Sequence, residues 1–311
     1  MTDFLWKNDT EPHSLKRTEL FRSHPEVKKL IGPEYKSKYI SFILVISQLS
    51  LAVLTKNLTG WKYWAILYIF GGTITQALFL SVHEISHNLF FKKTLHNRLF
   101  GMFCNLPIVF PFSESFRFYH LQHHSHMGGD NIDSDIPCAL ETKIFRGKLG
   151  KFVWYNFQIL FYALRPVLTK SQPITRYLII NFIIQIVFDT FLYHLVGIKP
   201  FQFLLLSLLI AGGFGLHPLS SHFVSEHYIF DKDGQFETGD YHGWLNCFTW
   251  NVGYHNAHHN MPNVPWSNLP HLTKLSCEDD KILVHKSWIL LPIKFILDDN
   301  ISLCSRIKRK T

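Results

Sequence analysis

Paired cysteines and charged side chains are both scarce in this chain of 311 residues. The five cysteines form no C-x-x-C pair, so the sequence supports neither a disulfide framework nor a zinc ribbon. Only 17 % of the residues are charged, and we find no repeats and no low-complexity linkers. The first 35 residues are polar, so we expect no cleavable signal peptide, and targeting would then fall to the first transmembrane helix.

Hydrophobic residues, in contrast, are abundant and are gathered into long runs. They make up 47 % of the sequence and include 28 phenylalanines. The net charge is +8, and lysine and arginine lie mostly outside the apolar runs. A basic chain can bind nucleic acid or an anionic membrane surface. Because long apolar runs accompany the basic charge, we expect membrane lipids as partners and no nucleic acid.

The apolar runs pair into two predicted hairpins. A bilayer core needs about 20 apolar residues per helix; the first run is slightly short for this, and the other three are long enough. We therefore predict an all-α, polytopic membrane protein with four transmembrane helices and a helical cap. The four predicted spans are 39–54, 61–82, 177–198 and 200–221.

The rest of the chain then lies on one side of the membrane. Two hairpins return the chain to its starting side each time, and lysine and arginine are abundant on that side and sparse in the short connections, which makes it cytosolic. The broken apolar stretches 98–112 and 151–168 are not counted as spans. We predict a single domain over 1–311, made of a cytosolic amphipathic amino-terminal segment (1–38), hairpin 1 (39–82), a cytosolic cap segment (83–175), hairpin 2 (176–221) and a second cap segment with a basic tail (222–311).

One predicted span carries a polar stripe. Asn181, Gln185 and Asp189 recur every four residues and so share one helix face. Such a stripe forms hydrogen bonds between helices or lines a path for substrate or protons, and the sequence leaves both interpretations open.

Nineteen histidines are present, and eight of them fall into three clusters, "HEISH", "HLQHH" and "HNAHH". Each cluster has histidines at i and i+4, and the last two add i+3, so each presents its rings on one helix face. The predicted topology places all three clusters beyond the apolar hairpins on the same side, where they can converge. The eight residues are His83, His87, His120, His123, His124, His255, His258 and His259.

This histidine count indicates more than one metal ion. Zinc takes about four ligands, so eight imidazoles suit two transition metals with open positions for oxygen. Imidazole binds Fe, Zn, Cu and Ni alike, and ligand type alone does not choose iron. Acidic groups that orient imidazole ligands are available in Glu84, Glu114, Asp130, Asp133, Asp135 and Glu226.

Two other classes of protein remain as alternatives. The pentad from His83 to His87 reads H-E-x-x-H, the zinc-hydrolase pattern with Glu84 as general base, but a protease leaves the other six clustered histidines without a role. A metal carrier or lipid-binding membrane protein needs polar residues along several spans, and only one span shows them. Metal content separates the three classes of protein: we expect two irons per chain for an oxygenase, one zinc for a protease, and exchangeable metal for a carrier.

The three clusters on a four-span scaffold resemble the integral-membrane fatty-acyl desaturase and hydroxylase superfamily. The similarity runs from about residue 3 to 299 and is closer to one branch, the sphingolipid Δ4-desaturases (dihydroceramide desaturases). The histidine boxes specify only the superfamily. The branch is specified by the amino-terminal block "DFLWKNDTEPHSLKR" and by "GLHPLSSHFVSEHY"; further matching segments are "FRSHPEVKKLIGP", "DNIDSDIP" and "NVGYHNAHHNMPNVP".

This resemblance implies a non-haem di-iron centre with O2 as oxidant, held in the endoplasmic-reticulum membrane with the active site and both termini cytosolic. It implies electrons from NADH through cytochrome b5 and its reductase. No His-Pro-Gly-Gly haem sequence occurs in the chain, so the donor would be a separate protein. The implied reaction is 4,5-trans-desaturation of dihydroceramide to ceramide. C4 hydroxylation to phytoceramide, and acyl-lipid desaturation at another position, remain alternatives.

The resemblance also implies a ninth ligand upstream of the third box. We prefer His227, which precedes His255 by 28 residues, close to the family spacing. His222 is then expected to contact the ligands from outside, together with Glu84, Asp133, Asp135 and Glu226. One departure from the family is Gln122, where relatives carry an acid in the second box. If that acid orients a ligand, we expect metal affinity or tuning in this chain to differ from theirs.

Overall fold

The apolar helices form one bundle in the computed structural model, which describes residues 3–169, 171–231, 237–276 and 282–310. Within these residues three helical segments are long and apolar enough to cross a membrane. They are α2 (Ser37–Leu54), the continuous run of α3 (Gly60–Ile66), π-helical η2 (Leu67–Gly71) and α4 (Gly72–Ser86), and α9 (Arg176–Val196). The prediction of a mostly helical membrane protein is confirmed for these three spans.

The fourth predicted span, 200–221, is shorter than expected. The helix there, α10, covers Ile198–Ala211, which is 14 residues, or about 21 Å at 1.5 Å per residue against a hydrocarbon core of about 30 Å. It ends where the chain packs closely on α8 (Gly147–Thr169): a Cβ on Gly213, whose φ is +121°, would lie 2.4 Å from the Tyr155 carbonyl oxygen. The sequence runs on apolar past this point, but the contact requires glycine and ends the helix.

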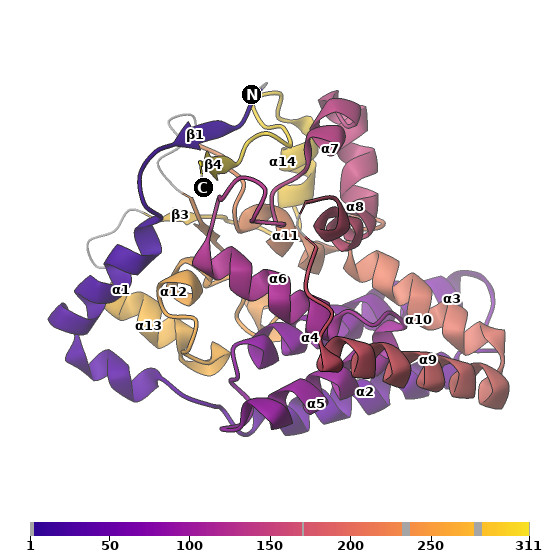
Figure 1. Cartoon of the computed structure of the whole chain (residues 1–311). Helices are drawn as coiled ribbons and strands as arrows, with labels where there is room; N and C mark the ends of the chain where they lie inside the picture. Colours follow the sequence, from indigo (N-terminus) through magenta and orange to yellow (C-terminus); the bar gives the residue numbers. More distant parts are fainter. Residues whose placement is uncertain (1–2, 170, 232–236, 277–281, 311) are drawn as a thin grey trace.

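Helices outside the bundle build the cap that holds the histidines (Figure 1). α5 (Thr94–Asn105) lies within the bundle, packed against α4 and α9 (Figure 1). The cap and its connections comprise α1 (Pro12–Ser23), η1 (Pro25–Leu30), η3 (Leu106–Ile108), α6 (Ser113–Ser125), α7 (Ala139–Ile144), α8, η4 (Pro218–Ser221), α11 (His222–Ser225), η5 (Trp244–Phe248), α12 (His255–Asn260), η6 (Trp266–Asn268), α13 (Leu269–Ser276) and α14 (Leu291–Leu297).

A sharp corner between α5 and α6 turns the second histidine cluster back towards the first. The two helices are bent by 114°. Asn105 at the end of α5 fixes this corner, because its Oδ1 accepts hydrogen bonds from the amides of Phe112 and Ser113, at 2.9 and 2.8 Å. These amides begin α6 and have no partner within that helix.

The polar stripe on α9 holds this corner against the bundle. Gln185 accepts from Asn105 Nδ2 at 2.6 Å and donates to Asp189 at 2.8 Å. Asn181 Oδ1 accepts from the amide of Glu114 at 3.2 Å. The structure therefore favours the first interpretation of the stripe, hydrogen bonding between helices.

Two short parallel ladders are the exception to an all-α chain. β1 (Leu5–Lys7) pairs with β4 (Ile307–Arg309), and β2 (Gly239–Asp240) pairs with β3 (Leu283–Val284). The first ladder brings the two ends of the chain side by side (Figure 1). The basic tail is consequently not a free extension: Arg309 is buried and donates to Glu237 at 2.6 Å, and Lys308 pairs with Asp130 at 2.7 Å.

Candidate metal centre

Four segments of the chain carry the nine histidines singled out above. His83 lies in the last turn of α4, and His87 is its C-cap; the next residue, Asn88, has a positive φ of 62°, a conformation that commonly ends helices. α6 carries the second cluster, α12 carries the third, and His227 follows α11. Asp240 accepts from the amide of Asn256 at 2.7 Å and so caps the start of α12.

The first group, which we call the five-histidine group, takes rings from all three clusters. Its ligand atoms all lie within 4.8 Å of one another, and its members are His83, His87, His120, His124 and His258. Successive Nε2 atoms approach closely: His87 to His120 at 2.8 Å, His120 to His124 at 3.2 Å, and His124 to His258 at 3.1 Å. The first cluster is therefore joined to the third through the second.

The second group, the three-histidine group, consists of His123, His227 and His259, again with all ligand atoms within 4.8 Å. His123 Nε2 lies 3.0 Å from His227 Nε2. His255 lies beside this group, with its Nε2 2.9 Å from that of His227 and its ring centroid 4.5 Å from that of His259. All nine predicted histidines thus lie in or beside two adjacent groups, and the role of each as a ligand stays a prediction.

Hydrogen bonds alone do not account for this packing. One imidazole nitrogen offers a single donor or a single acceptor site, yet His120 Nε2 and His227 Nε2 each approach two other Nε2 atoms. His83 Nε2 and His259 Nε2 are buried without a hydrogen-bond partner among the described residues. Two nitrogens bound at about 2.1 Å to one ion, at right angles, lie about 3.0 Å apart. The observed separations fit cations at the centre of each group.

Burial keeps most of these rings neutral, as metal binding requires. Burial, together with the neighbouring rings, holds the pKa of His120, His124 and His258 well below the usual range. His123 is the exception: burial lowers its pKa, but the charge and hydrogen bond of Asp133 outweigh burial and raise it.

Carboxylates contact the groups from outside. Asp133 Oδ1 lies 3.0 Å from His123 Nδ1, so the Nε2 of that ring is left to face the centre. Glu226 Oε1 lies 2.8 Å from His222 Nδ1 and 3.8 Å from His255 Nδ1. Glu226 therefore bonds to His222 and approaches His255 only through its charge, and His222 lies outside both groups.

Glu84 and Asp135, two further acidic candidates, differ in their contacts. Glu84 lies 3.5 Å from His83 Nδ1, and its other oxygen accepts from the amide of Trp266 at 2.9 Å. Among the described residues, Asp135 makes no hydrogen bond to any of the nine histidine rings. Its carboxylate instead forms an ion pair with Arg306. Burial raises the pKa of Asp135, and Arg306, His123 and His227 outweigh burial and hold it far below the usual range.

Gln122, the departure from the family pattern, faces away from both groups. It lines a separate hollow with Arg98, Glu114 and Arg117, whose walls contain none of the nine histidines. Its buried Oε1 has no partner among the described residues. The expectation that this position tunes a ligand therefore receives no support from its contacts.

Several residues that support the histidine groups were not predicted from the sequence. Gln76 Nε2 lies 2.5 Å from His222 Nε2, and Arg117 donates to the Ser86 carbonyl at 2.5 Å, closing the end of α4. Gln76 precedes His83 by seven residues, so helical periodicity offered a signal for it. Arg17 of α1 donates to the carbonyls of Asn260 and His259 at 2.8 and 3.3 Å, and no local pattern marks that contact.

An aromatic-walled hollow opens on the histidines. The wall runs through neighbouring rings, with centroids 5.5 Å apart for Phe116 and Phe79, 6.1 Å for Phe79 and Phe223, and 5.9 Å for Phe223 and Tyr162. His83 and His120 lie in the same lining. These walls suit an apolar group held beside the histidines, in about 40 Å³ of free space.

Two family models and several known proteins are similar to this sequence. The sequence model of the fatty acid desaturase family matches residues 59–287, and that of the sphingolipid Delta4-desaturase (DES) family matches residues 1–36. The chain is 41 % identical over 321 residues to the sphingolipid delta(4)-desaturase of Komagataella phaffii, covering 99 % of this chain and 89 % of that protein. It is 44 % identical over 312 residues to the sphingolipid delta(4)-desaturase DES1 of Mus musculus, covering 99 % and 95 %, and 42 % identical over 314 residues to that of Drosophila melanogaster, covering 99 % and 96 %.

Proposed function

The chain belongs to the fatty acid desaturase family, and from this premise we propose that it is a membrane-bound sphingolipid Δ4-desaturase that converts dihydroceramide to ceramide. The observation that carries the proposal is the convergence of nine imidazoles in two adjacent groups beside an aromatic hollow. The amino-terminal match to the sphingolipid branch and the near full-length relatives support the substrate class.

We propose two non-haem irons as the resident metals, one in each histidine group. When bound, they supply the activation of O2 that removal of hydrogen from an unactivated C–H bond requires. The balance is then complete: the lipid gives up two hydrogens, a donor supplies two further electrons, two protons are taken up from water, and O2 is reduced to two waters. His83, His87, His120, His124 and His258 would hold one iron, and His123, His227, His255 and His259 the other.

The chain's own residues supply orientation and shielding. Asp133 fixes the ring of His123 through a hydrogen bond, and the Glu226 carboxylate, which bonds to His222, lies 3.8 Å from His255 Nδ1 and supports that ring by its charge. The wall of Phe79, Phe116 and Phe223 excludes water from the space beside the rings, which limits side reactions of a strong oxidant.

Electrons are proposed to come from NADH through a separate cytochrome b5 and its reductase. The net charge of +8 favours association with an acidic donor. We place the protein in the endoplasmic-reticulum membrane, with the histidine cap and both ends of the chain on the cytosolic side, because lysine and arginine concentrate outside the spans.

The reaction is tested by expression in cells that lack their own Δ4-desaturase, followed by mass spectrometry of the sphingolipids. We expect ceramide, which is dihydroceramide less two hydrogens; phytoceramide, which has gained one oxygen, would show the hydroxylase alternative. Absence of both products from membranes containing the inserted protein would contradict the proposal.

Variants from each histidine group test the shared centre. His87→Ala in the five-histidine group and His123→Ala in the three-histidine group should both abolish product and lower bound iron, with membrane insertion retained. The matched control is His271→Ala, an exposed histidine on α13 outside both groups, which should keep activity. Product from both ligand variants at the control's level would refute the shared centre.

A further inference from the structure

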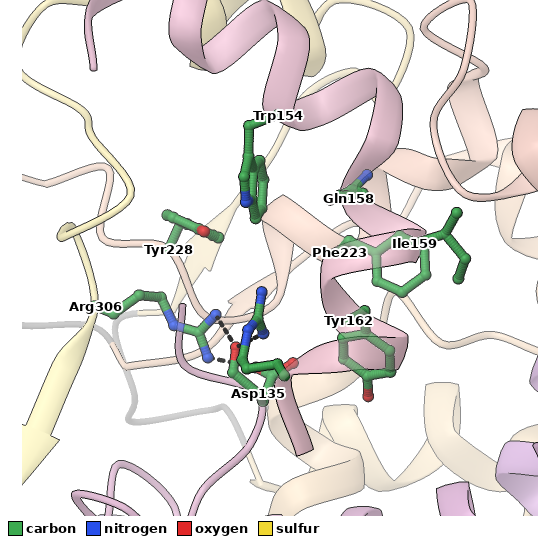
Figure 2. A pocket seen from close by; sticks show the side chains of 9 residues that line it. Asp135, Trp154, Gln158, Ile159, Tyr162, Phe223, Tyr228 and Arg306 are labelled. Carbon is green, nitrogen blue, oxygen red and sulfur yellow. Dashed lines mark hydrogen bonds and ion pairs between the residues drawn. The ribbon is translucent and has the colours of Figure 1, made fainter. Parts of the chain in front are cut away.

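A second hollow adjoins the metal centre on the side of α8, and we call it the head pocket. Its lining includes Trp154, Gln158, Tyr162, Tyr228 and Arg306 (Figure 2). It shares Asp135, Tyr162 and Phe223 with the aromatic hollow beside the histidines. Whatever occupies the head pocket therefore lies next to a chain held at the metal centre.

The charged groups of the head pocket are already paired. Arg306 forms an ion pair with Asp135, drawn as dashed lines in Figure 2. Arg165 binds Glu141 through two nitrogens at 2.7 and 2.9 Å. Both guanidinium groups are thus neutralised by carboxylates. An anionic head such as a phosphate would find no unpaired cation among these residues, so the pocket suits an uncharged ligand.

Two polar atoms in the lining have no such partner. Gln158 and Tyr228 are each only 3 % exposed. Neither Gln158 Nε2 nor the Tyr228 hydroxyl makes a hydrogen bond with any described residue. Burial raises the pKa of Tyr228 far above its usual range, so the group remains a neutral phenol. A buried polar group without a partner costs stability, so each of these two groups needs an explanation, and a ligand that completes its hydrogen bond would supply one.

The pocket is small. It leaves about 20 Å³ for a bound group, enough for one or two small polar atoms but not for a hydrocarbon chain. Gln158 Nε2 can only donate, and the Tyr228 hydroxyl can donate or accept. The complementary ligand is a neutral group with oxygen lone pairs, such as a hydroxyl or an amide carbonyl.

We propose that the head pocket receives one oxygen-bearing group of the uncharged polar head of the sphingoid lipid, with Gln158 Nε2 and the Tyr228 hydroxyl as the groups that bond to its oxygen. This inference rests on the proposed function and deepens it. In dihydroceramide the hydroxyl-bearing carbon is bonded directly to one of the two carbons that lose hydrogen. A head group anchored here would hold that carbon pair in the adjoining aromatic hollow. The position of the double bond would then be set by the number of bonds between the anchored group and the carbons in that hollow.

The test is equilibrium binding to the full-length, iron-loaded protein in lipid nanodiscs. The probe is a radiolabelled short-chain dihydroceramide, and the comparison ligand is its analogue with both head hydroxyls removed. Wild-type protein should prefer dihydroceramide. Tyr228→Phe and Gln158→Leu should each bind it about two- to tenfold more weakly, the range for one neutral hydrogen bond, and should lose part of the preference over the analogue.

A stability measurement separates this role from a structural one. Tyr228→Phe removes a hydroxyl that no described residue satisfies, so its melting temperature without lipid should equal or exceed that of wild type. The matched control is Tyr155→Phe: Tyr155 is also fully buried, but its hydroxyl bonds to Ser220 Oγ at 2.9 Å. The control should melt at a lower temperature and bind dihydroceramide with wild-type affinity.

The outcomes distinguish the two proposals. If wild type converts dihydroceramide while both variants bind it as tightly as wild type, the head pocket proposal fails and the proposed function stands. If wild type neither converts nor binds dihydroceramide, both fail. A fall in melting temperature of Tyr228→Phe equal to that of the control, without a change in affinity, likewise assigns the residue to packing and overturns the inference.

Discussion

Replacement of Asp133 by asparagine should release one metal and leave the other in place. Asp133 Oδ1 lies 3.0 Å from His123 Nδ1 and accepts from the amide of Asp135 at 2.9 Å; Oδ2 accepts from the amide of Gly128 at 2.8 Å. Asparagine keeps the shape but removes the charge and turns one acceptor into a donor. At least one of the three N–H groups that now bond to Asp133 then faces the NH2 donor of asparagine in place of an acceptor.

The magnitude follows from these contacts. A hydrogen bond to a charged group contributes about 1.5–3 kcal/mol. Loss of a carboxylate behind a ligating histidine lowers metal affinity about 10- to 100-fold, which equals about 1.4–2.8 kcal/mol. The two ranges agree. Because His123 is the only one of the nine histidines to which Asp133 bonds, the effect should be confined to the three-histidine group with His255.

The assay is iron per chain after dialysis of purified protein against a graded series of chelator concentrations. Wild type should lose its two irons at similar concentrations of free chelator. Asp133→Asn should lose one of its irons at a free chelator concentration about 10- to 100-fold lower than wild type. The matched control is Asp130→Asn in the same loop, whose carboxylate pairs with Lys308 at 2.7 Å and touches neither group. A folded Asp133→Asn variant that retains both irons with the wild-type midpoint would refute the reasoning.

Three further variants test other parts of the structure. Glu84→Gln should reduce iron affinity and activity only partly, since Glu84 supports His83 from outside; complete inactivity with both irons bound would instead indicate a base. Arg17→Gln should lower the free energy of unfolding by about 1.5–3 kcal/mol, because the carbonyls of His259 and Asn260 at the end of α12 lose a charged donor. Denaturant titration measures this change, and an unchanged midpoint would contradict it. Burial raises the pKa of Glu141, but the charge and hydrogen bond of Arg165 outweigh burial and lower it. The ionised carboxylate therefore stabilises the fold above its unfolded-state pKa of about 4.3. This stabilisation is lost as the pH falls through the lower pKa of the folded state. Glu141→Gln should therefore melt at a lower temperature at pH 7 and depend less on pH in acid than wild type; equal acid sensitivity of the two proteins would count against the pair.

Local spacing in the sequence was sufficient to identify the histidines and three of the spans. Imidazoles at i, i+3 and i+4 share a helix face wherever the segment is helical, and α6 and α12 are helical at those residues. Apolar runs of bilayer length likewise predict α2, the α3–α4 run and α9 without knowledge of their neighbours. These features depend on residues close together in the chain.

The assignment of each ring to a group was decided by the tertiary structure. Neighbouring residues of a helix point about 100° apart, so His123 and His124 enter different groups, as do His258 and His259. The length of α10 also depends on a distant contact, because Gly213 must pack on Tyr155. Likewise Gln158 and Tyr228, 70 residues apart in the numbering, meet at one hollow only because α8 lies beside the segment after α11. The sequence determined which side chains were available for the chemistry, while long-range packing decided which of them meet.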